Sequence, residues 1–144
     1  MQVKAPLDKA QAKLINPVVL AFVGDAVFSL YVRERLVFSS GGRAADYQRA
    51  SAKLVSAHGQ SDFLNGLLPC LTEEEQEIFR RGRNAKKGTK SKNASAVDYN
   101  RSTGLEAVMG YLYLLGERER LIAIFNQTDE SLLKGQALQK VFKP

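Results

Sequence analysis

The sequence predicts an all-α protein, a compact bundle of seven or eight helices. Almost no stretch alternates polar and apolar residues with the period of two that is typical of a half-buried strand. Apolar residues instead recur with helical spacing through most of the chain, and helix start and stop signals separate these stretches. The length of 144 residues suits one domain with a buried core.

The first half of the chain carries signals for four helices. Asn16 is a suitable N-cap, and Pro17 suits the first helical position because an N–H there would lack a helical partner in any case. A long helix should therefore begin here and end at the Ser-Ser-Gly-Gly sequence of residues 39–42. Pro69 closes the fourth helix. We expect these helices over residues 7–15, 17–39, 43–56 and 60–67.

The second half carries signals for four more helices and one loop. Thr72 to Glu75 form a capping-box sequence, whose three glutamates also suit the positive end of a helix dipole. Residues 84–96 show no apolar periodicity, so we expect a loop that is mobile in the free protein. Gly116 is a C-cap signal. We expect the helices over residues 73–83, 98–115, 117–127 and 131–141.

Two isolated carboxylates are the main candidates for chemistry. Asp25 is the only charge among the fifteen residues from Val18 to Val32, and Glu106 is the only charge from Thr103 to Leu115. An ionised carboxylate in such surroundings is costly to bury unless it is hydrogen-bonded, paired or bound to a metal. The local sequences Gly-Asp-Ala-Val and Leu-Glu-Ala-Val are alike. The small neighbours that leave room beside both acids are Gly24, Ala26, Gly104, Ala107 and Gly110.

Two such acids suggest carboxylates that converge on a shared divalent cation. Oxygen-only ligation favours Mg²⁺ or Mn²⁺. A cation beside a phosphate can activate water and neutralise charge, so phosphodiester hydrolysis is the natural chemistry. No rival catalytic set is present, because His58 is the only histidine and Cys70 the only thiol. The alternative, in which Asp25 and Glu106 simply make buried hydrogen bonds or ion pairs, stays open.

The net charge of +6 is concentrated in one segment. Between Arg80 and Arg101 the chain has eight Lys or Arg and one acid, Asp98, so the remainder is nearly neutral. Such clustering is typical of nucleic-acid binding through phosphates. No aromatic residue lies between Arg80 and Asp98, which disfavours base stacking and favours recognition of duplex RNA by shape and backbone. The alternative is that this basic segment is a solvated loop whose charges keep the protein soluble.

Composition argues against a secreted or membrane-spanning protein. The single cysteine, Cys70, excludes an intrachain disulfide framework. Charged residues are scattered through the N-terminus, which has no continuous apolar core of the signal-peptide type. The apolar stretch from Pro17 to Val32 contains Asp25 and falls short of the roughly 20 residues that a membrane span requires. We expect a cytoplasmic protein with no membrane partner.

The motifs around the two acids resemble those of a known family. Residues 22–36, FVGDAVFSLYVRERL, are similar to the signature helix of the ribonuclease III catalytic domain. Residues 102–116, STGLEAVMGYLYLLG, are similar to its late, glutamate-bearing helix. The order of NPVVLAFVGDAV, LVSAHGQ, RRGRNAK and YNRSTGLEAVMGYLYL in so short a chain resembles the Mini-ribonuclease III class of this family, over about residues 16–127.

This resemblance implies a homodimeric endonuclease that uses Mg²⁺, or Mn²⁺ in its place, to hydrolyse double-stranded RNA. Asp25 and Glu106 match the family's catalytic, metal-binding acids. One ribonuclease III-type domain would span residues 1–144, with its core at 16–127 and no separate RNA-binding domain. RNA affinity must then come from the catalytic dimer itself. The implied RNA-binding residues are Arg49, Lys53, Arg81, Arg83, Lys86, Lys87, Lys90, Lys92 and Arg101, with His58 and Gln60 as further candidates.

The chain also departs from full-length ribonuclease III. Val18 and Ala21 occupy the positions of two glutamates ahead of the signature aspartate, and Thr103 occupies the position of an acid before Glu106. These absences are a feature of the Mini class, and the remaining two carboxylates are compatible with one cation or two. The usual substrate of that class is precursor 23S ribosomal RNA, in bacteria or plastids. Two other functions stay open: a catalytically inactive double-stranded-RNA-binding protein, and a helical Mg²⁺-dependent nucleotide phosphohydrolase.

Overall fold

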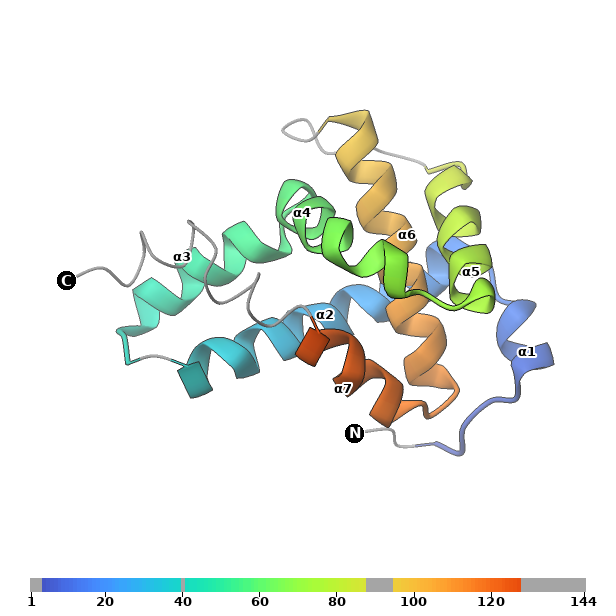
Figure 1. Cartoon of the computed structure of the whole chain (residues 1–144), viewed down its shortest axis with the longest axis horizontal. Coiled ribbons are helices and arrows are strands. Elements are labelled where there is room, and N and C mark those ends of the chain that lie inside the picture. Colours follow the sequence, from blue (N-terminus) through green and yellow to red (C-terminus); the bar gives the residue numbers. More distant parts are fainter. Residues whose placement is uncertain (1–3, 40, 88–94, 128–144) are drawn as a thin grey trace.

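The computed structural model describes residues 4–39, 41–87 and 95–127, and every regular element in these ranges is a helix. The predicted all-α class is therefore confirmed (Figure 1). The elements are α1 (Lys9–Lys13), α2 (Pro17–Ser39), α3 (Ala44–Val55), α4 (Ala57–Leu67), the 3-10 helix η1 (Leu68–Cys70), α5 (Glu73–Asn84), α6 (Ala96–Leu114) and α7 (Arg118–Gln127).

Most helix ends lie where the caps in the sequence predict them. The Asn16 side chain accepts a hydrogen bond from the backbone N–H of Val18 at 2.8 Å, and Pro17 is the first residue of α2. In the capping box of α5, Thr72 Oγ1 accepts from the Glu75 N–H at 3.1 Å and Glu75 Oε1 from the Thr72 N–H at 3.0 Å. Gly116, with a φ of 75°, follows the end of α6.

Four expectations differ from the structure or lie beyond it. Helix α4 begins at Ala57, before the predicted residue 60, because Ser56 Oγ caps it by accepting from the Gly59 N–H at 3.0 Å. Helix α1 is shorter than the predicted 7–15. The predicted helix over 131–141 and residues 88–94 of the predicted loop lie outside the described residues.

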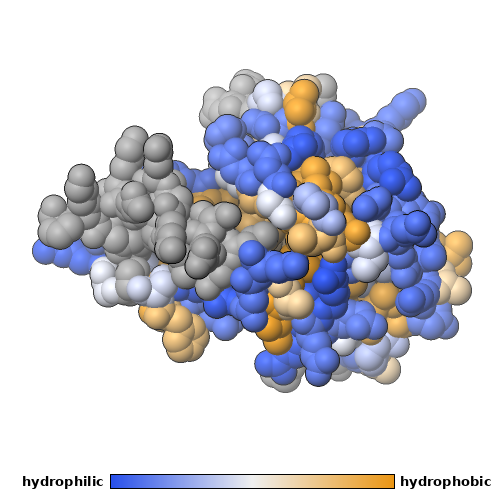
Figure 2. Space-filling model, viewed as in Figure 1, coloured by the Kyte–Doolittle hydropathy of each residue, from blue (hydrophilic) through white to orange (hydrophobic). Residues whose placement is uncertain are grey.

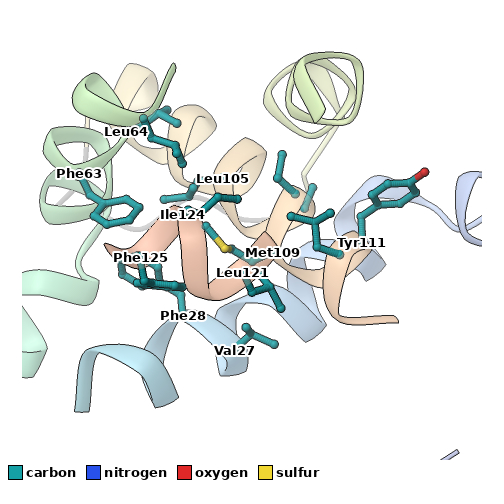
Figure 3. Close-up of a cluster of buried hydrophobic side chains, with 14 of the residues drawn as sticks. Val27, Phe28, Phe63, Leu64, Leu105, Met109, Tyr111, Leu121, Ile124 and Phe125 are labelled. Carbon is teal, nitrogen blue, oxygen red and sulfur yellow. The ribbon is translucent and has the colours of Figure 1, made fainter. Parts of the chain in front are cut away.

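Helix α6 is the centre of the bundle, and α2, α4 and α5 all pack against it (Figure 1). Three aromatic rings from α2, α4 and α7 meet beside it: Phe28 lies 5.2 Å from Phe63 and 5.7 Å from Phe125 between ring centroids. Figure 3 shows these rings surrounded by aliphatic side chains, including Leu105 and Met109 from α6. Apolar burial of this extent is the main stabilising term of the fold.

A buried ion pair links α5 to α7. Arg120 donates from Nε to Glu75 Oε2 at 2.9 Å and from Nη2 to Glu75 Oε1 at 2.8 Å. A second bond from Nη2 reaches the Cys70 carbonyl oxygen at 2.9 Å. Glu75 is buried, so its charge depends on this bidentate partner and on the Thr72 N–H.

Helix α2 is apolar on more than its core face. Phe28, Val32 and Leu36 point into the core, whereas Val19, Phe22 and Leu30 are exposed, Phe22 at 79%. The face of the molecule seen in Figure 2 is mostly hydrophilic, with several separate hydrophobic groups. Within the described ranges no helix combines the length and hydropathy that a membrane crossing would need.

Candidate active site

The backbones of α2 and α6 touch where the helices cross. A Cβ atom on Gly24 would lie 1.6 Å from the carbonyl oxygen of Glu106, and one on Gly110 would lie 1.9 Å from the carbonyl oxygen of Leu20. Only glycine, which lacks Cβ, permits this approach at both positions. The small residues of the two motifs therefore set the spacing between α2 and α6. From the sequence, we expected these residues only to leave room beside the two acids.

This crossing brings the two predicted acids together. Asp25 follows Gly24 on α2, and its carboxyl group shares a hydrogen bond with that of Glu106 on α6. The pKa of Glu106 is raised from 4.5 to about 9, mainly by burial and in addition by hydrogen bonding to Asp25 and by the negative charge of Asp25. The juxtaposition is as predicted, but Asp25 itself is exposed rather than buried, and Glu106 is the half-buried member.

Gln60 on α4 is a third polar group beside this pair. Its side chain is buried, and Nε2 donates to the Val55 carbonyl oxygen at 3.0 Å and to Glu106 Oε2 at 3.4 Å. The bond to Glu106 favours the ionised carboxylate and so lowers its pKa. Gln60 was a candidate for RNA contact, but with only 3% of its surface exposed it lies inside the protein instead.

The oxygen atoms at this place fit a hard divalent cation. Two carboxylates in contact with each other are electrostatically unfavourable when both are ionised, and a divalent cation between them would relieve this repulsion. Gln60 Oε1 is buried and has no hydrogen-bond partner among the described residues. No group of three or more His, Cys, Asp or Glu that could hold a metal occurs in the described part of the chain, so Asp25 and Glu106 would have to share the cation with water.

Val18, Ala21 and Thr103 occupy the positions at which full-length ribonuclease III has further acids. All three are buried or half-buried in helices. Ala21 is buried and Val18 is half-buried on α2. Thr103 is buried, and its hydroxyl donates to the Tyr99 carbonyl oxygen at 3.0 Å. None of these side chains supplies an ionised ligand to the pair.

Several predicted RNA-binding cations make bonds within the protein. Arg101 donates from Nε to Ser61 Oγ at 2.7 Å and from Nη2 to Asn65 Oδ1, which ties α6 to α4. Lys87 donates from Nζ to the carbonyl oxygens of Ala85 at 2.8 Å and of Arg83 at 3.2 Å, near the end of α5. Two contacts are weaker or more local: Arg81 to the Ile15 carbonyl oxygen at 3.5 Å, and Arg49 to Asp46.

The other predicted cations are exposed or undescribed. Lys53, Arg83 and Lys86 are exposed, and the Arg83 guanidinium lies over the Phe79 ring at 5.6 Å from its centroid. Lys90 and Lys92 lie outside the described residues. Figure 1 shows α3, which carries Arg49 and Lys53, and the end of α5 on opposite sides of α4 and the start of α6. Arg49 and Lys53 are therefore separated from the cations at the end of α5, and Arg101 lies on α6, bonded to α4.

His58 is an exposed residue whose ring links α4 to α6. Its Nδ1 lies 3.2 Å from Asp98 Oδ2 and its Nε2 lies 3.4 Å from Asp62 Oδ2. The hydrogen bond to Asp98, followed by the charges of Asp62 and Asp98, raises the pKa of His58 above its usual value. Asp98 and Asp62 thus account for both of its ring nitrogens.

Known proteins resemble this chain over most of its length. The ribonuclease III domain matches residues 18–117, which include both acids. Proteins named Mini-ribonuclease 3 are 42% identical in Symbiobacterium thermophilum (85% of this chain, 94% of that protein) and 45% identical in Brevibacillus brevis (79% and 85%). A crystal structure of a Fusobacterium nucleatum protein is 28% identical and superposes with a TM-score of 0.73, covering 83% of this chain and 95% of that one.

Proposed function

Because the chain belongs to the ribonuclease III family, within its Mini-ribonuclease III group, we propose that it is a Mg²⁺-dependent endoribonuclease that cleaves double-stranded RNA. Family membership makes it a nuclease of the hydrolase class. The observation that carries the finer proposal is the crossing of α2 and α6, at which Asp25 and Glu106 share a hydrogen bond.

Asp25 and Glu106 would hold the cation and act as the catalytic residues. A bound Mg²⁺, or Mn²⁺ in its place, supplies charge neutralisation at the phosphate and a lowered pKa for an attacking water. Asp25, which is exposed, would face the RNA, and Glu106 would anchor the site from the protein side. Gly24 and Gly110 keep the two carboxylates at a fixed spacing, so their orientation does not have to be organised when the substrate binds.

The charge distribution supports duplex RNA as the substrate. Lys53 and Lys86 are exposed and available to phosphates, and Arg83 is exposed although its Nε donates to Asn84 Oδ1. Arg101 and Lys87 bond within the protein and would add mainly positive potential. Cations spread over α3, α6 and the end of α5 suit a rod-shaped duplex whose backbone passes over all three. Lys90 and Lys92 lie outside the described residues and stay candidates from the sequence alone. A nucleotide phosphohydrolase would have little use for so many cations.

We also propose that the active form is a homodimer that packs through α2. Val19, Phe22, Ala26 and Leu30 are exposed at helical spacing, which makes one apolar stripe along the helix. An exposed apolar stripe of this kind is typical of an interaction site, and a second copy of the same stripe would cover it. Asp25 neighbours the stripe, so each active site would lie beside the dimer interface.

The natural substrate that we propose is precursor 23S ribosomal RNA, because the chain belongs to the Mini-ribonuclease III group. A cytoplasmic location in a bacterium, or a plastid location, remains a prediction.

The decisive experiment is cleavage of a long, perfectly paired RNA with and without Mg²⁺. The wild type should cut only with Mg²⁺, whereas Asp25→Asn and Glu106→Gln should bind the RNA without cutting it. Glu119→Gln removes an exposed carboxylate on α7 and should cut normally. Binding without cleavage by the wild type would instead indicate a catalytically inactive RNA-binding protein. Cleavage of nucleotides with no RNA cleavage would indicate the phosphohydrolase.

A further inference from the structure

Gln60 is a polar residue in the apolar stripe of α4. The buried side chains Phe63, Leu64 and Leu67 follow it at the spacing of three, four and seven residues that defines the core-facing side of a helix. Gln60 is 3% exposed and therefore belongs to the same buried face. An apolar residue would satisfy the packing requirement at this position, so the amide needs another explanation.

The hydrogen bonds of Gln60 account for only one of its two polar atoms. Nε2 donates to the Val55 carbonyl oxygen, which belongs to the last residue of α3, and to Glu106 Oε2. The bond to Val55 satisfies a carbonyl at a helix end, and this is the structural explanation for a glutamine here. It leaves Oε1, which is buried and has no partner among the described residues. A buried acceptor in this state is unfavourable for folding alone.

The position of this acceptor points to the site. Oε1 and Nε2 are bonded to the same carbon, and Nε2 contacts Glu106, so Oε1 belongs to the immediate surroundings of the carboxylate pair. Waters on a hard cation are hydrogen-bond donors, and the partners that accept from them orient the ligands. We propose that Gln60 is a positioning residue for the cation: Nε2 orients Glu106, and Oε1 accepts a hydrogen bond from water that the cation carries.

This inference rests on the proposed metal site, and its test uses cation binding rather than cleavage. Mn²⁺ is titrated into the intact protein without RNA, and free Mn²⁺ is followed by electron paramagnetic resonance. Gln60→Met keeps the length of the side chain and removes both hydrogen-bonding atoms. We expect it to weaken Mn²⁺ binding about tenfold or more, as loss of groups that orient ligands usually does.

Two further variants separate a role at the site from a role in packing. Ser61→Ala, on the next residue of α4, removes a hydrogen bond between α4 and α6 that does not involve the carboxylates, and its Mn²⁺ affinity should equal that of the wild type. Gln60→Glu restores oxygen at this position and should bind Mn²⁺ more tightly than Gln60→Met. Equal affinity of Gln60→Met and wild type would overturn the inference, as would equal losses in Gln60→Met and Ser61→Ala, or no gain in Gln60→Glu.

A measurement on the wild type serves if Gln60→Met does not fold. In ¹⁵N-labelled protein, the side-chain NH₂ resonances of Gln60 should shift when Mg²⁺ is added. The midpoint of this shift should equal the midpoint of the Mg²⁺ binding that Asp25→Asn abolishes. Resonances that do not move would refute the role of Gln60. Failure of the proposed metal site has a different signature, since the wild type would then bind no Mn²⁺ that depends on Asp25.

Discussion

The carboxyl group of Glu106 lies beside that of Asp25, and hydrogen bonding to Asp25 and the negative charge of Asp25 add to burial in raising the pKa of Glu106 to about 9. A pKa of about 9 leaves the Glu106 carboxyl group mostly protonated at neutral pH in the protein without metal. The folded protein therefore carries a proton on Glu106, the carboxyl group at which a cation would bind. Metal ions and protons must compete for Glu106.

Cation binding should release this proton. With a pKa of about 9 in the fold, Glu106 is protonated near neutral pH, so each bound Mg²⁺ or Mn²⁺ should displace about one proton and bind more tightly as pH rises toward that value. Calorimetry in two buffers of different ionisation enthalpy measures the release, and Glu106→Gln should lose it. Binding without proton release would contradict the raised pKa.

The same proton affects stability without metal. The unfolded chain gives up the Glu106 proton above its ordinary pKa of 4.5, whereas the folded chain keeps it until about pH 9. The unfolded state thus binds fewer protons in this window, so the contribution of Glu106 to the free energy of unfolding falls as pH rises. Urea denaturation of wild type and Glu106→Gln across this window should show a steeper decline in the wild type.

Alanine at Gly24 should destabilise the protein although alanine favours helices. The added Cβ would overlap the Glu106 carbonyl oxygen, so we expect a loss of about 1–3 kcal/mol or more in the free energy of unfolding. Gly41→Ala is the control, since nothing lies within 4 Å of its Cβ position. Urea denaturation measures both. A Gly24→Ala protein as stable as wild type would mean that the α2–α6 contact is looser than described.

Removing Arg120 should cost about 3 kcal/mol or more in the free energy of unfolding, because Glu75 would remain buried without its cation. Arg118→Ala, at an exposed position on the same helix, should change stability little. The double variant Arg120→Met with Glu75→Leu should recover much of the loss, because no unpaired charge is then buried. Thermal or urea denaturation checks all three.

Exposed and internally bonded cations should differ in their effects. Lys86→Ala should weaken duplex-RNA binding and reduce its salt dependence without changing the free energy of unfolding, because its side chain is exposed. Arg101→Ala should lower the free energy of unfolding, because it breaks bonds to Ser61 and Asn65. Fluorescence anisotropy over a salt series and urea denaturation separate the two effects.

Unchanged cleavage at moderate salt after alanine replaces Lys86, Lys87, Lys90 and Lys92 would refute the proposed RNA surface.

The proposed dimer should depend on Phe22. Phe22→Asp places a charge in the exposed apolar stripe of α2 and should give monomers in analytical ultracentrifugation. Leu14→Asp changes a side chain of similar exposure that lies outside α2, and it should leave the assembly unchanged. A Phe22→Asp protein that sediments like the wild type would place the interface elsewhere.

The sequence predicted the local features of the helices, and of the features that depend on packing it predicted only some. The caps at Asn16 and Thr72 act within a few residues, so their patterns identified helix starts correctly. The pairing of Asp25 with Glu106 was also predictable, because each acid stands alone in an apolar helix. Which acid is the buried one was not, since that depends on how far α2 and α6 approach each other.

The contacts of Gln60 and Arg101 could not be predicted from the sequence either, because they also depend on how the helices pack. Arg101 belongs to a basic segment, and nothing nearby in the chain indicates that Ser61 and Asn65 bind its guanidinium. Gln60 did leave one signal, because it occupies an apolar position in the periodicity of α4. A polar residue in a core stripe is thus worth testing as part of a site.

The contact between the main chains at Gly24 and Gly110 also bears on how this protein can evolve. A spacing set by side chains would drift whenever one of them is exchanged, but main-chain atoms are the same in every residue. Substitutions in the surrounding core can therefore accumulate while the two carboxylates keep their separation. A methyl group at Gly24 or at Gly110 is the exception, because it would push apart the helices that carry both acids. The site therefore depends on two residues that have no Cβ atom, Gly24 and Gly110.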